Sequence, residues 1–243
     1  MFKKPMNMVL CLSVMAALLW SPLARASWVV EQVEKMGSAG INVKTTMTFG
    51  DKVLRADNAE MNSSIIMDFK GNKMYMIQHA AKMYMELDIA ALSAQMKDMI
   101  ERVKVKDQGS MVVIKETGEH KTINGFACEK LAVVKNGKEV GEIWVTKDIK
   151  DKDVSGVYQQ FFEMAGAQNQ SQQAIERLEG LKKAISMGFP IQTVHIEEDG
   201  SKNIVEVLSA GQKTVSADYF VPPKDYQGRP MALPGMMAPQ KQK

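Results

Sequence analysis

Apolar and polar residues alternate with a period of two over residues 41–49. One face of this segment carries Ile41, Val43, Thr45, Met47 and Phe49, while the intervening positions are polar. Because successive side chains of a strand point to opposite sides, this pattern predicts a half-buried β-strand. A second strand is predicted near residues 52–56, after a turn at Gly50 and Asp51.

Three further short strands are predicted at residues 64–69, 73–78 and 82–87. The short turns between them contain Gly71 and Asn72 in the first case and His79 in the second. Short turns between alternating segments are typical of antiparallel hairpins. The apolar residues predicted to line the meander's inner face are Ile65, Met67, Met74, Met76, Met83 and Met85.

Helical periodicity follows the meander. Leu92, Met96 and Met99 recur at steps of four and three residues, which predicts an amphipathic helix over residues 89–103 with Asp88 as its N-cap. Other helices are predicted at 27–38, 155–165 and 175–185, and further strands within 111–134 and at 140–146, 191–197 and 203–208. Together these elements predict an α+β fold: a curved antiparallel β-sheet, or half-barrel, with helices packed on one face.

Residues 1–26 have the pattern of a cleavable secretory signal peptide. Lys3 and Lys4 precede an apolar run over residues 8–20, and Ala24 and Ala26 supply the small residues of a cleavage site. The run is too short to span ~30 Å of hydrocarbon comfortably. We therefore expect export to the periplasm of a Gram-negative cell envelope, a mature chain that begins near Ser27, and no permanent membrane span after cleavage.

The remaining chain is predicted to contain a single domain and a tail. Residues 27–221 carry all of the strand and helix patterns and are long enough to bury one core. Residues 222–243 contain five of the eight prolines, a composition that predicts a proline-rich disordered tail.

Loss of residues 1–26 also changes the charge. It removes Lys3, Lys4 and Arg25 and no acidic residue, so the formal net charge falls from +3 to 0. A neutral chain without an arginine-rich stripe argues against nucleic acid as a partner.

Only Cys128 remains after Cys11 is removed with the signal peptide. The mature chain therefore cannot form an intramolecular disulfide. We expect the thiol of Cys128 to be buried, because apolar residues surround it in a strand-like segment.

Residues typical of a catalytic or cofactor site do not converge in the sequence. His79, His120 and His195 are isolated, and none belongs to a zinc motif, a nucleophile elbow or a phosphate-binding loop. The acidic residues fall mostly at strand edges, turns and helix surfaces. These features predict a protein that is not an enzyme and that needs no cofactor or resident metal.

Methionine is the unusual component of the composition: twenty are present, and four of these lie within residues 1–26. Flexible, polarizable thioethers suit adaptable apolar surfaces as well as ordinary cores. The pairs Met74/Met76 and Met83/Met85 also allow an alternative, a Cu(I) site formed by Met-x-Met strands with His79 nearby, because soft thioethers select Cu(I).

Several segments together resemble an exported bacterial family, domain-of-unknown-function family 4412. The resemblance rests on Ser64–Phe69, Met83–Leu87, Thr122–Lys130, Glu142–Val145 and Phe220–Pro222. That family looks like a relative of the periplasmic lipoprotein-carrier (LolA/LolB-like) fold, which implies a half-barrel closed by helices around a lipid-accepting cavity. The resemblance implies a fold without assigning any functional residue.

These observations lead to one functional hypothesis and two alternatives. The hypothesis is a periplasmic, non-enzymatic binding protein that holds an apolar ligand, either a lipid or a lipoprotein acyl chain, between sheet and helices. The alternatives are the Cu(I)-binding protein and a structural or interaction protein of the cell envelope with a solid core. The residues expected to bind the apolar ligand are Val43, Met47, Ile65, Met67, Met74, Met76, Met83, Met85, Leu92, Met96 and Met99.

Overall fold

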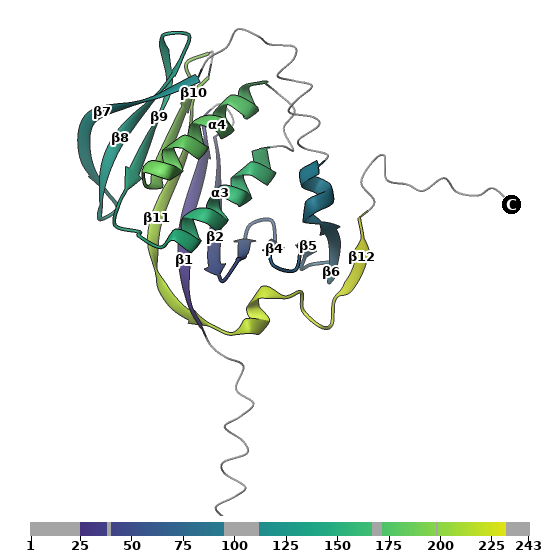
Figure 1. The fold of residues 1–243 in the computed structure, drawn as a ribbon. Coiled ribbons are helices and arrows are strands. Elements are labelled where there is room, and N and C mark those ends of the chain that lie inside the picture. The colour runs from purple at the N-terminus through teal and green to yellow at the C-terminus, as the bar shows by residue number, and fades with distance from the viewer. Residues whose placement is uncertain (1–24, 38–39, 95–111, 167–171, 198, 232–243) are drawn as a thin grey trace, which may run out of the picture.

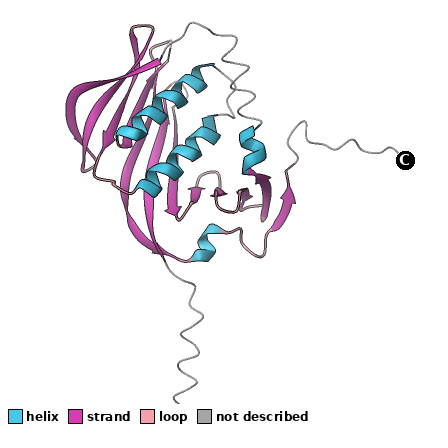
Figure 2. Cartoon of the chain, in the orientation of Figure 1, coloured by secondary structure: helices cyan, strands magenta, loops and turns pink. Residues whose placement is uncertain are grey.

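The computed structural model describes residues 25–37, 40–94, 112–166, 172–197 and 199–231. Within these ranges the chain forms one twelve-stranded sheet that is open at both ends, with helices against one of its faces (Figures 1 and 2). The strands are β1 (Arg25–Met36), β2 (Ile41–Gly50), β3 (Val53–Asn58), β4 (Ser63–Asp68), β5 (Lys73–Gln78), β6 (Met83–Asp88), β7 (Val112–Ile123), β8 (Phe126–Lys135), β9 (Lys138–Thr146), β10 (Phe189–Ile196), β11 (Lys202–Val215) and β12 (Gln227–Pro230). The helices are α3 (Lys152–Gly166), α4 (Gln172–Met187) and the 3₁₀ helix η2 (Ala217–Phe220), and residues 89–94 are also helical.

The strand order is β12-β6-β5-β4-β3-β2-β1-β11-β10-β9-β8-β7. Every neighbouring pair is antiparallel except β12 and β6, which are parallel. The N-terminal half forms the meander β1–β6, and the C-terminal half returns to pair β11 with β1. The prediction of a curved antiparallel sheet with helices on one face is therefore confirmed.

The meander has a ten-residue repeat. Asn62, Asn72 and Lys82 have positive φ angles of 47°, 57° and 48°, and each immediately precedes the first residue of a strand. Asparagine tolerates this left-handed conformation better than most residues. Each repeat combines a six-residue strand with a four-residue turn, and this regularity aligns the side chains of β4, β5 and β6 in straight rows.

Helices α3 and α4 cover the concave side of the sheet (Figure 1), whereas η2 lies against β3 on the opposite face. Helix α4 contacts β7, β9 and β10, whereas α3 contacts β2 and β3. The largest apolar cluster lies between them and includes Met47 and Phe49 from β2, Tyr158 from α3 and Phe189 from β10. No helix of the described residues is long and apolar enough to cross a membrane.

Two terminal segments differ from the sequence-based expectation. Residues 27–36 form a strand and not a helix, because β2 and β11 pair with both edges of β1 and bury Val29 and Val30 on its opposite faces. The tail expected from residue 222 does not begin there, since Gln227–Pro230 form β12 at the edge of the sheet. Prolines are compatible with an edge strand, where a missing N–H leaves no neighbour unpaired.

Candidate ligand-binding face

Two rows of side chains cross the concave face of the meander. Residues paired directly across neighbouring strands share a face of the sheet, so the register defines each row. The first row runs through Val30, Met47, Ala56, Ile65, Met76 and Met85. The second row runs through Trp28, Phe49, Leu54, Met67, Met74 and Leu87.

The second row is covered at the meander end. Met67 and Met74 are 2% and 1% exposed and pack with Leu87, Ile89 and Met164 in one apolar cluster. Ile89 begins the helical segment that follows β6, and Met164 lies on α3. These two methionines are therefore part of a packed core formed by the meander and its covering helices.

The first row is covered from β1 to β3, where Ala56 is also buried. Val30 and Met47 are fully buried, but Ile65, Met76 and Met85 are only half-buried. Leu92 and Phe161, which are also half-buried, pack on the same cluster from the helical side. The half-buried part of this row is the candidate ligand-binding face, which we name the methionine strip: Ile65, Met76 and Met85.

The remaining residues proposed from the sequence have different positions. Val43 is half-buried and shares the concave side, but it pairs with Glu34 beyond the end of β3. Met83 is half-buried beside Gln78 at the start of β6. Met96 and Met99 lie outside the described residues.

Strand β12 extends the concave face by one strand, which the composition of residues 222–243 does not predict. Gln227 pairs with Met83 and Arg229 pairs with Met85, so both lie on the concave side of β12. Their strand is held by hydrogen bonds from the Gln227 amide to the Lys82 carbonyl and from the Met231 amide to the Glu86 carbonyl, both 2.9 Å long. The methionine strip therefore leads directly to Arg229.

The opposite, outer face of β3–β5 carries a hydrogen-bonded cluster. We name it the outer-face cluster: Arg55, Asp57, Ser64, His79, Tyr219 and Tyr226. Both Tyr219 and Ser64 donate hydrogen bonds to the Asp57 carboxylate, the first at 2.6 Å, and Arg55 Nε donates to it at 2.8 Å. Burial raises the pKa of Asp57, but these hydrogen bonds and the Arg55 charge outweigh it and hold the pKa below its ordinary value.

The outer-face cluster fixes the C-terminal segment to the sheet. Arg55 donates a 2.9 Å hydrogen bond to the carbonyl of Tyr219, and its guanidinium lies 4.5 Å from the centre of that ring. His79 Nδ1 lies 3.0 Å from the Tyr226 hydroxyl. These contacts join strands β3–β5 to residues more than 140 positions later, and they place β12 beside β6.

Serine, histidine and aspartate meet in this cluster, but their arrangement differs from that of a hydrolase triad. The Ser64 hydroxyl is 2.7 Å from His79 Nε2 and also donates directly to Asp57. In a triad the carboxylate instead holds the other imidazole nitrogen, a position occupied here by Tyr226. Ser64 is also only 2% exposed. The geometry is therefore suited to holding the C-terminal segment against the sheet.

The outer-face cluster argues against the Cu(I) alternative, because it contains His79. Met76 and Met85 pair directly across β5 and β6, as that alternative requires. His79, however, points to the outer face, where Ser64 and Tyr226 engage both of its ring nitrogens. Met74 is packed in the core. The described residues also contain no group of three or more His, Cys, Asp or Glu placed to hold a metal.

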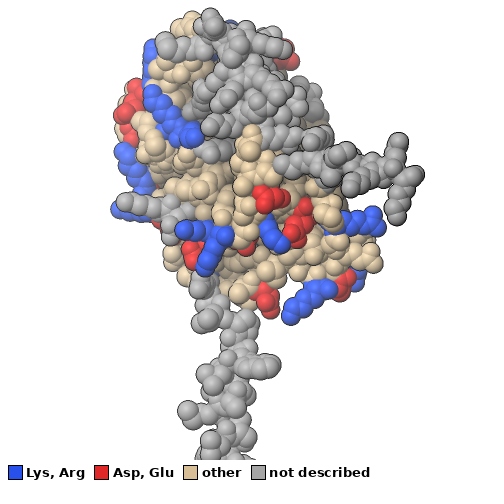
Figure 3. All heavy atoms as spheres, turned by 45° about the vertical axis from the view of Figure 1, so that its right-hand side comes forward, with Lys and Arg blue, Asp and Glu red and all other residues tan. Residues whose placement is uncertain are grey.

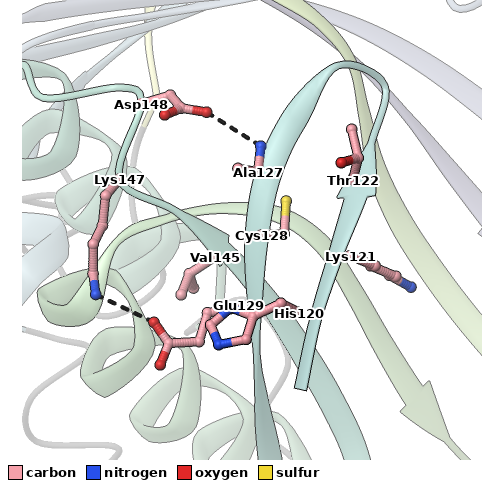
Figure 4. Close-up of a pocket in the computed structure, with 9 residues that line it drawn as sticks. All are labelled: His120, Lys121, Thr122, Ala127, Cys128, Glu129, Val145, Lys147 and Asp148. Atoms are coloured by element: carbon pink, nitrogen blue, oxygen red, sulfur yellow. Dashed lines mark hydrogen bonds and ion pairs between the residues drawn. The ribbon is translucent and has the colours of Figure 1, made fainter. Parts of the chain in front are cut away.

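A separate pocket of about 490 Å³ lies at the ends of β7, β8 and β9 (Figure 4). Its wall includes Cys128, His120 and Glu129, and Glu129 pairs with Lys147 at 3.2 Å. Cys128 is free and 3% exposed, which confirms its expected burial. Burial raises the pKa of its thiol, so this cysteine has the character of an unreactive core residue.

Charged residues on the β6 and β12 side of the molecule are mixed in sign. Lys73 pairs with Glu86 at 2.6 Å and Lys82 pairs with Asp225 at 2.8 Å. In Figure 3, which brings this side forward, positive and negative side chains are interspersed and neither forms a continuous patch.

Comparison with known proteins gives distant structural similarities. PNGF-II is similar over 85% of this chain and 31% of its own, with 12% identity and a TM-score of 0.43. In the Pseudomonas aeruginosa MucA/MucB complex, one chain is similar over 84% of this chain and 58% of its own, with 10% identity and a TM-score of 0.45. A LolA superfamily protein from Nitrosomonas europaea is similar over 81% of this chain and 90% of its own, with 7% identity and a TM-score of 0.28. The chain thus spans less than two thirds of the length of the first two proteins, and values this low carry no information about ligand or partner.

No curated protein sequence matches the chain significantly. A family model for a domain of unknown function, DUF4412, matches residues 33–226. This range begins within β1, contains strands β2–β11 together with α3 and α4, and ends at Tyr226 in the C-terminal segment. It also contains every segment on which the resemblance to this family was based. The chain therefore belongs to the DUF4412 family.

Proposed function

We propose that this protein is a non-enzymatic binding protein of the cell envelope that holds an acyl chain on its methionine strip. The observation that supports this most is the graded burial along one row of side chains. Val30 and Met47 are fully covered, whereas Ile65, Met76 and Met85 continue the same row and remain half-buried. An apolar ligand placed on the strip would complete the cover that the helices provide elsewhere.

The chemistry of the strip favours a flexible apolar ligand. Two of its three members are methionines, whose unbranched side chains adapt to irregular shapes. Leu92 and Phe161 face the neighbouring cluster from the helical side and offer a second apolar wall. Each methylene of a ligand buried between these walls contributes about 0.8 kcal/mol, so several methylenes suffice for measurable binding.

The test is titration of the purified protein with N-phenylnaphthylamine, an uncharged apolar probe, together with mass spectrometry of co-purifying lipid. We expect saturable binding of the probe. Met76→Lys should weaken it about tenfold or more, because an apolar ligand cannot compensate a buried ammonium. Met61→Lys is the matched control, since Met61 is 65% exposed and lies in the turn before β4.

Met85→Lys provides a second variant at a half-buried position of the strip and should reproduce the effect of Met76→Lys. If the probe does not bind saturably and no lipid co-purifies, the protein is a solid-core structural or interaction protein and the proposal is wrong. Equal losses in the Met61 and Met76 variants would also contradict it.

Export is a second part of the proposal and rests on the signal-peptide pattern of residues 1–26. Ser27 is 2% exposed within β1, so the expected mature chain would begin inside the sheet. N-terminal sequencing of the exported protein should begin within a few residues of Ser27. Recovery of the intact N-terminus from the periplasmic fraction would contradict cleavage.

A further inference from the structure

We propose that the ligand carries a carboxylate head and that Arg229 binds it, so that the preferred ligand is a free fatty acid. This inference rests on the proposed acyl-chain function and adds the chemical class of the ligand. Arg229 follows Met85 in the first row, because β12 pairs with β6 in register. The row therefore passes from a fully buried apolar end at Val30 and Met47 to a guanidinium at its exposed end.

The direction of the Arg229 side chain is supported by its neighbour Gly228. A Cβ at Gly228 would collide with the phenol ring of Tyr84, lying 2.8 Å from its Cε2 atom. Tyr84 pairs with Ile77, which in turn pairs with Ser64 of the outer-face cluster. Position 228 therefore faces the outer side, and Arg229 faces the concave side with Met85.

Arg229 is the single charged residue among the concave positions of β4, β5, β6 and β12. The other members of this set are Ser63, Ile65, Met67, Met74, Met76, Gln78, Met83, Met85, Leu87 and Gln227. Nearby lysines are already paired, Lys73 with Glu86 and Lys82 with Asp225. Arg229 is exposed. It makes no ion pair or side-chain hydrogen bond with another described residue, so no described group occupies the fork of donors that its guanidinium offers to an anion.

The spacing of these groups fits an amphiphile with one chain. Ile65 lies on β4, and Arg229 lies three strands away on β12. At ~4.8 Å between neighbouring strands, the distance across the sheet from Ile65 to Arg229 is about 14 Å. A medium-length acyl chain can lie across the strip with its terminal methyl toward the buried end and its carboxylate at Arg229. Guanidinium and carboxylate pair in a bidentate geometry.

The experiment compares dodecanoate with dodecanol by calorimetric titration of the purified protein. The two ligands share a chain and differ in the head, so their affinities isolate the interaction with Arg229. We expect dodecanoate to bind about fivefold more tightly, which corresponds to ~1 kcal/mol for a partly exposed ion pair. Arg229→Gln should remove this preference and leave dodecanol binding unchanged. Arg229→Lys should retain part of the preference, because it keeps the charge and loses the fork.

Lys73→Gln is the matched control, since it removes one positive charge from the adjoining strands on the outer face and should not alter the preference. If dodecanol and dodecanoate bind equally to the unaltered protein, the assignment of Arg229 is wrong while the apolar site remains. If Arg229→Gln lowers the affinity for both ligands equally, Arg229 only stabilises strand β12, and its assignment as the carboxylate-binding residue is again wrong. If neither ligand nor the uncharged probe binds, the proposed function itself fails.

Arg229 lies just beyond residues 33–226, the range matched by the family model. The proposed head-group preference is therefore argued from this chain's own residues and not from its family.

Discussion

The hydroxyl of Tyr219 donates a 2.6 Å hydrogen bond to the carboxylate of Asp57, which lies 162 residues earlier in the chain. This contact attaches the segment after β11 to the outer face of β3. It also fixes the path of the chain toward β12, whose Arg229 lies beside the methionine strip. A hydrogen bond on the outer face thus helps to define the candidate site on the concave face.

Asp57→Asn should reduce the free energy of unfolding by about 2–3 kcal/mol, because a half-buried carboxylate loses charge-assisted hydrogen bonds from Tyr219, Ser64 and Arg55. Urea denaturation measures the change. Glu60→Gln, at an exposed turn position, is the control and should change stability by less than about 0.5 kcal/mol. A loss of similar size in both variants would contradict the special role of Asp57.

The stability difference between the unaltered protein and Asp57→Asn should depend on pH. The pKa of Asp57 is lowered in the folded state, so its contribution is present above the unfolded pKa of about 3.9 and is lost as the pH falls through the folded pKa. We expect a constant difference between about pH 5 and 7 and a decreasing difference below about pH 4. Denaturation curves across this range provide the measurement, and a difference that grows on acidification would disprove the assignment.

Met74→Ala and Met85→Ala should separate the packed core from the candidate binding face. Met74 is 1% exposed and packs with Met67 and Met164, so its truncation should cost about 2–5 kcal/mol of stability. Met85 is half-buried, so its truncation to alanine should reduce stability by about 1 kcal/mol or less. Apolar-probe binding should fall in the Met85 variant even where the fold is intact. Similar stability losses at the two positions would show that both belong to the core.

Gly228→Ala should loosen β12, because the added methyl would meet the ring of Tyr84. The Gln227 amide donates to Lys82, the residue before β6, and the Met231 amide donates to Glu86 in β6. Both amides should exchange with deuterium faster in this variant. Gly211→Ala is the control, since its Cβ would meet no heavy atom within 4 Å. Unchanged exchange at both amides would mean that Tyr84 moves aside and that position 228 does not restrict the strand.

Cys128 should react slowly with a thiol reagent in the native protein and rapidly in urea. Its side chain is 3% exposed, its Sγ lies 3.4 Å from the Phe126 carbonyl oxygen, and burial raises the pKa of its thiol. Reactivity follows the exposed thiolate. Native labelling at the rate of a free small thiol would show that the adjoining pocket admits reagents to Cys128.

The sequence by itself determined the meander and its apolar face. A period of two is a local property, and each turn between β3 and β6 contains a residue with positive φ immediately before the next strand. The alternation places Ile65 and Met67 on one face of β4 and Met74 and Met76 on one face of β5, and a shift of the pairing by one residue would separate these apolar faces. The helical periodicity of residues 155–165 and 175–185 likewise indicated α3 and α4.

Only the tertiary structure decided which part of the apolar face is covered. Met74 and Met76 follow the same sequence pattern, yet Met74 is in the core and Met76 is half-buried. The difference arises because Met164, from an element 90 residues later in the chain, packs beside Met74. Burial depends on such distant partners, which local periodicity does not encode.

Dependence on distant partners also explains why the two ends of the domain form strands that the sequence pattern does not predict. Residues 27–36 carry apolar positions compatible with a helix, but β2 and β11 supply hydrogen-bonding partners on both sides and make this segment a strand. Residues 227–230 have the composition of a tail, yet the contacts of Asp57 with Tyr219 and of His79 with Tyr226 bring them to the edge of β6. Sequence patterns report local preference, whereas pairing and burial depend on contacts between residues far apart in the chain.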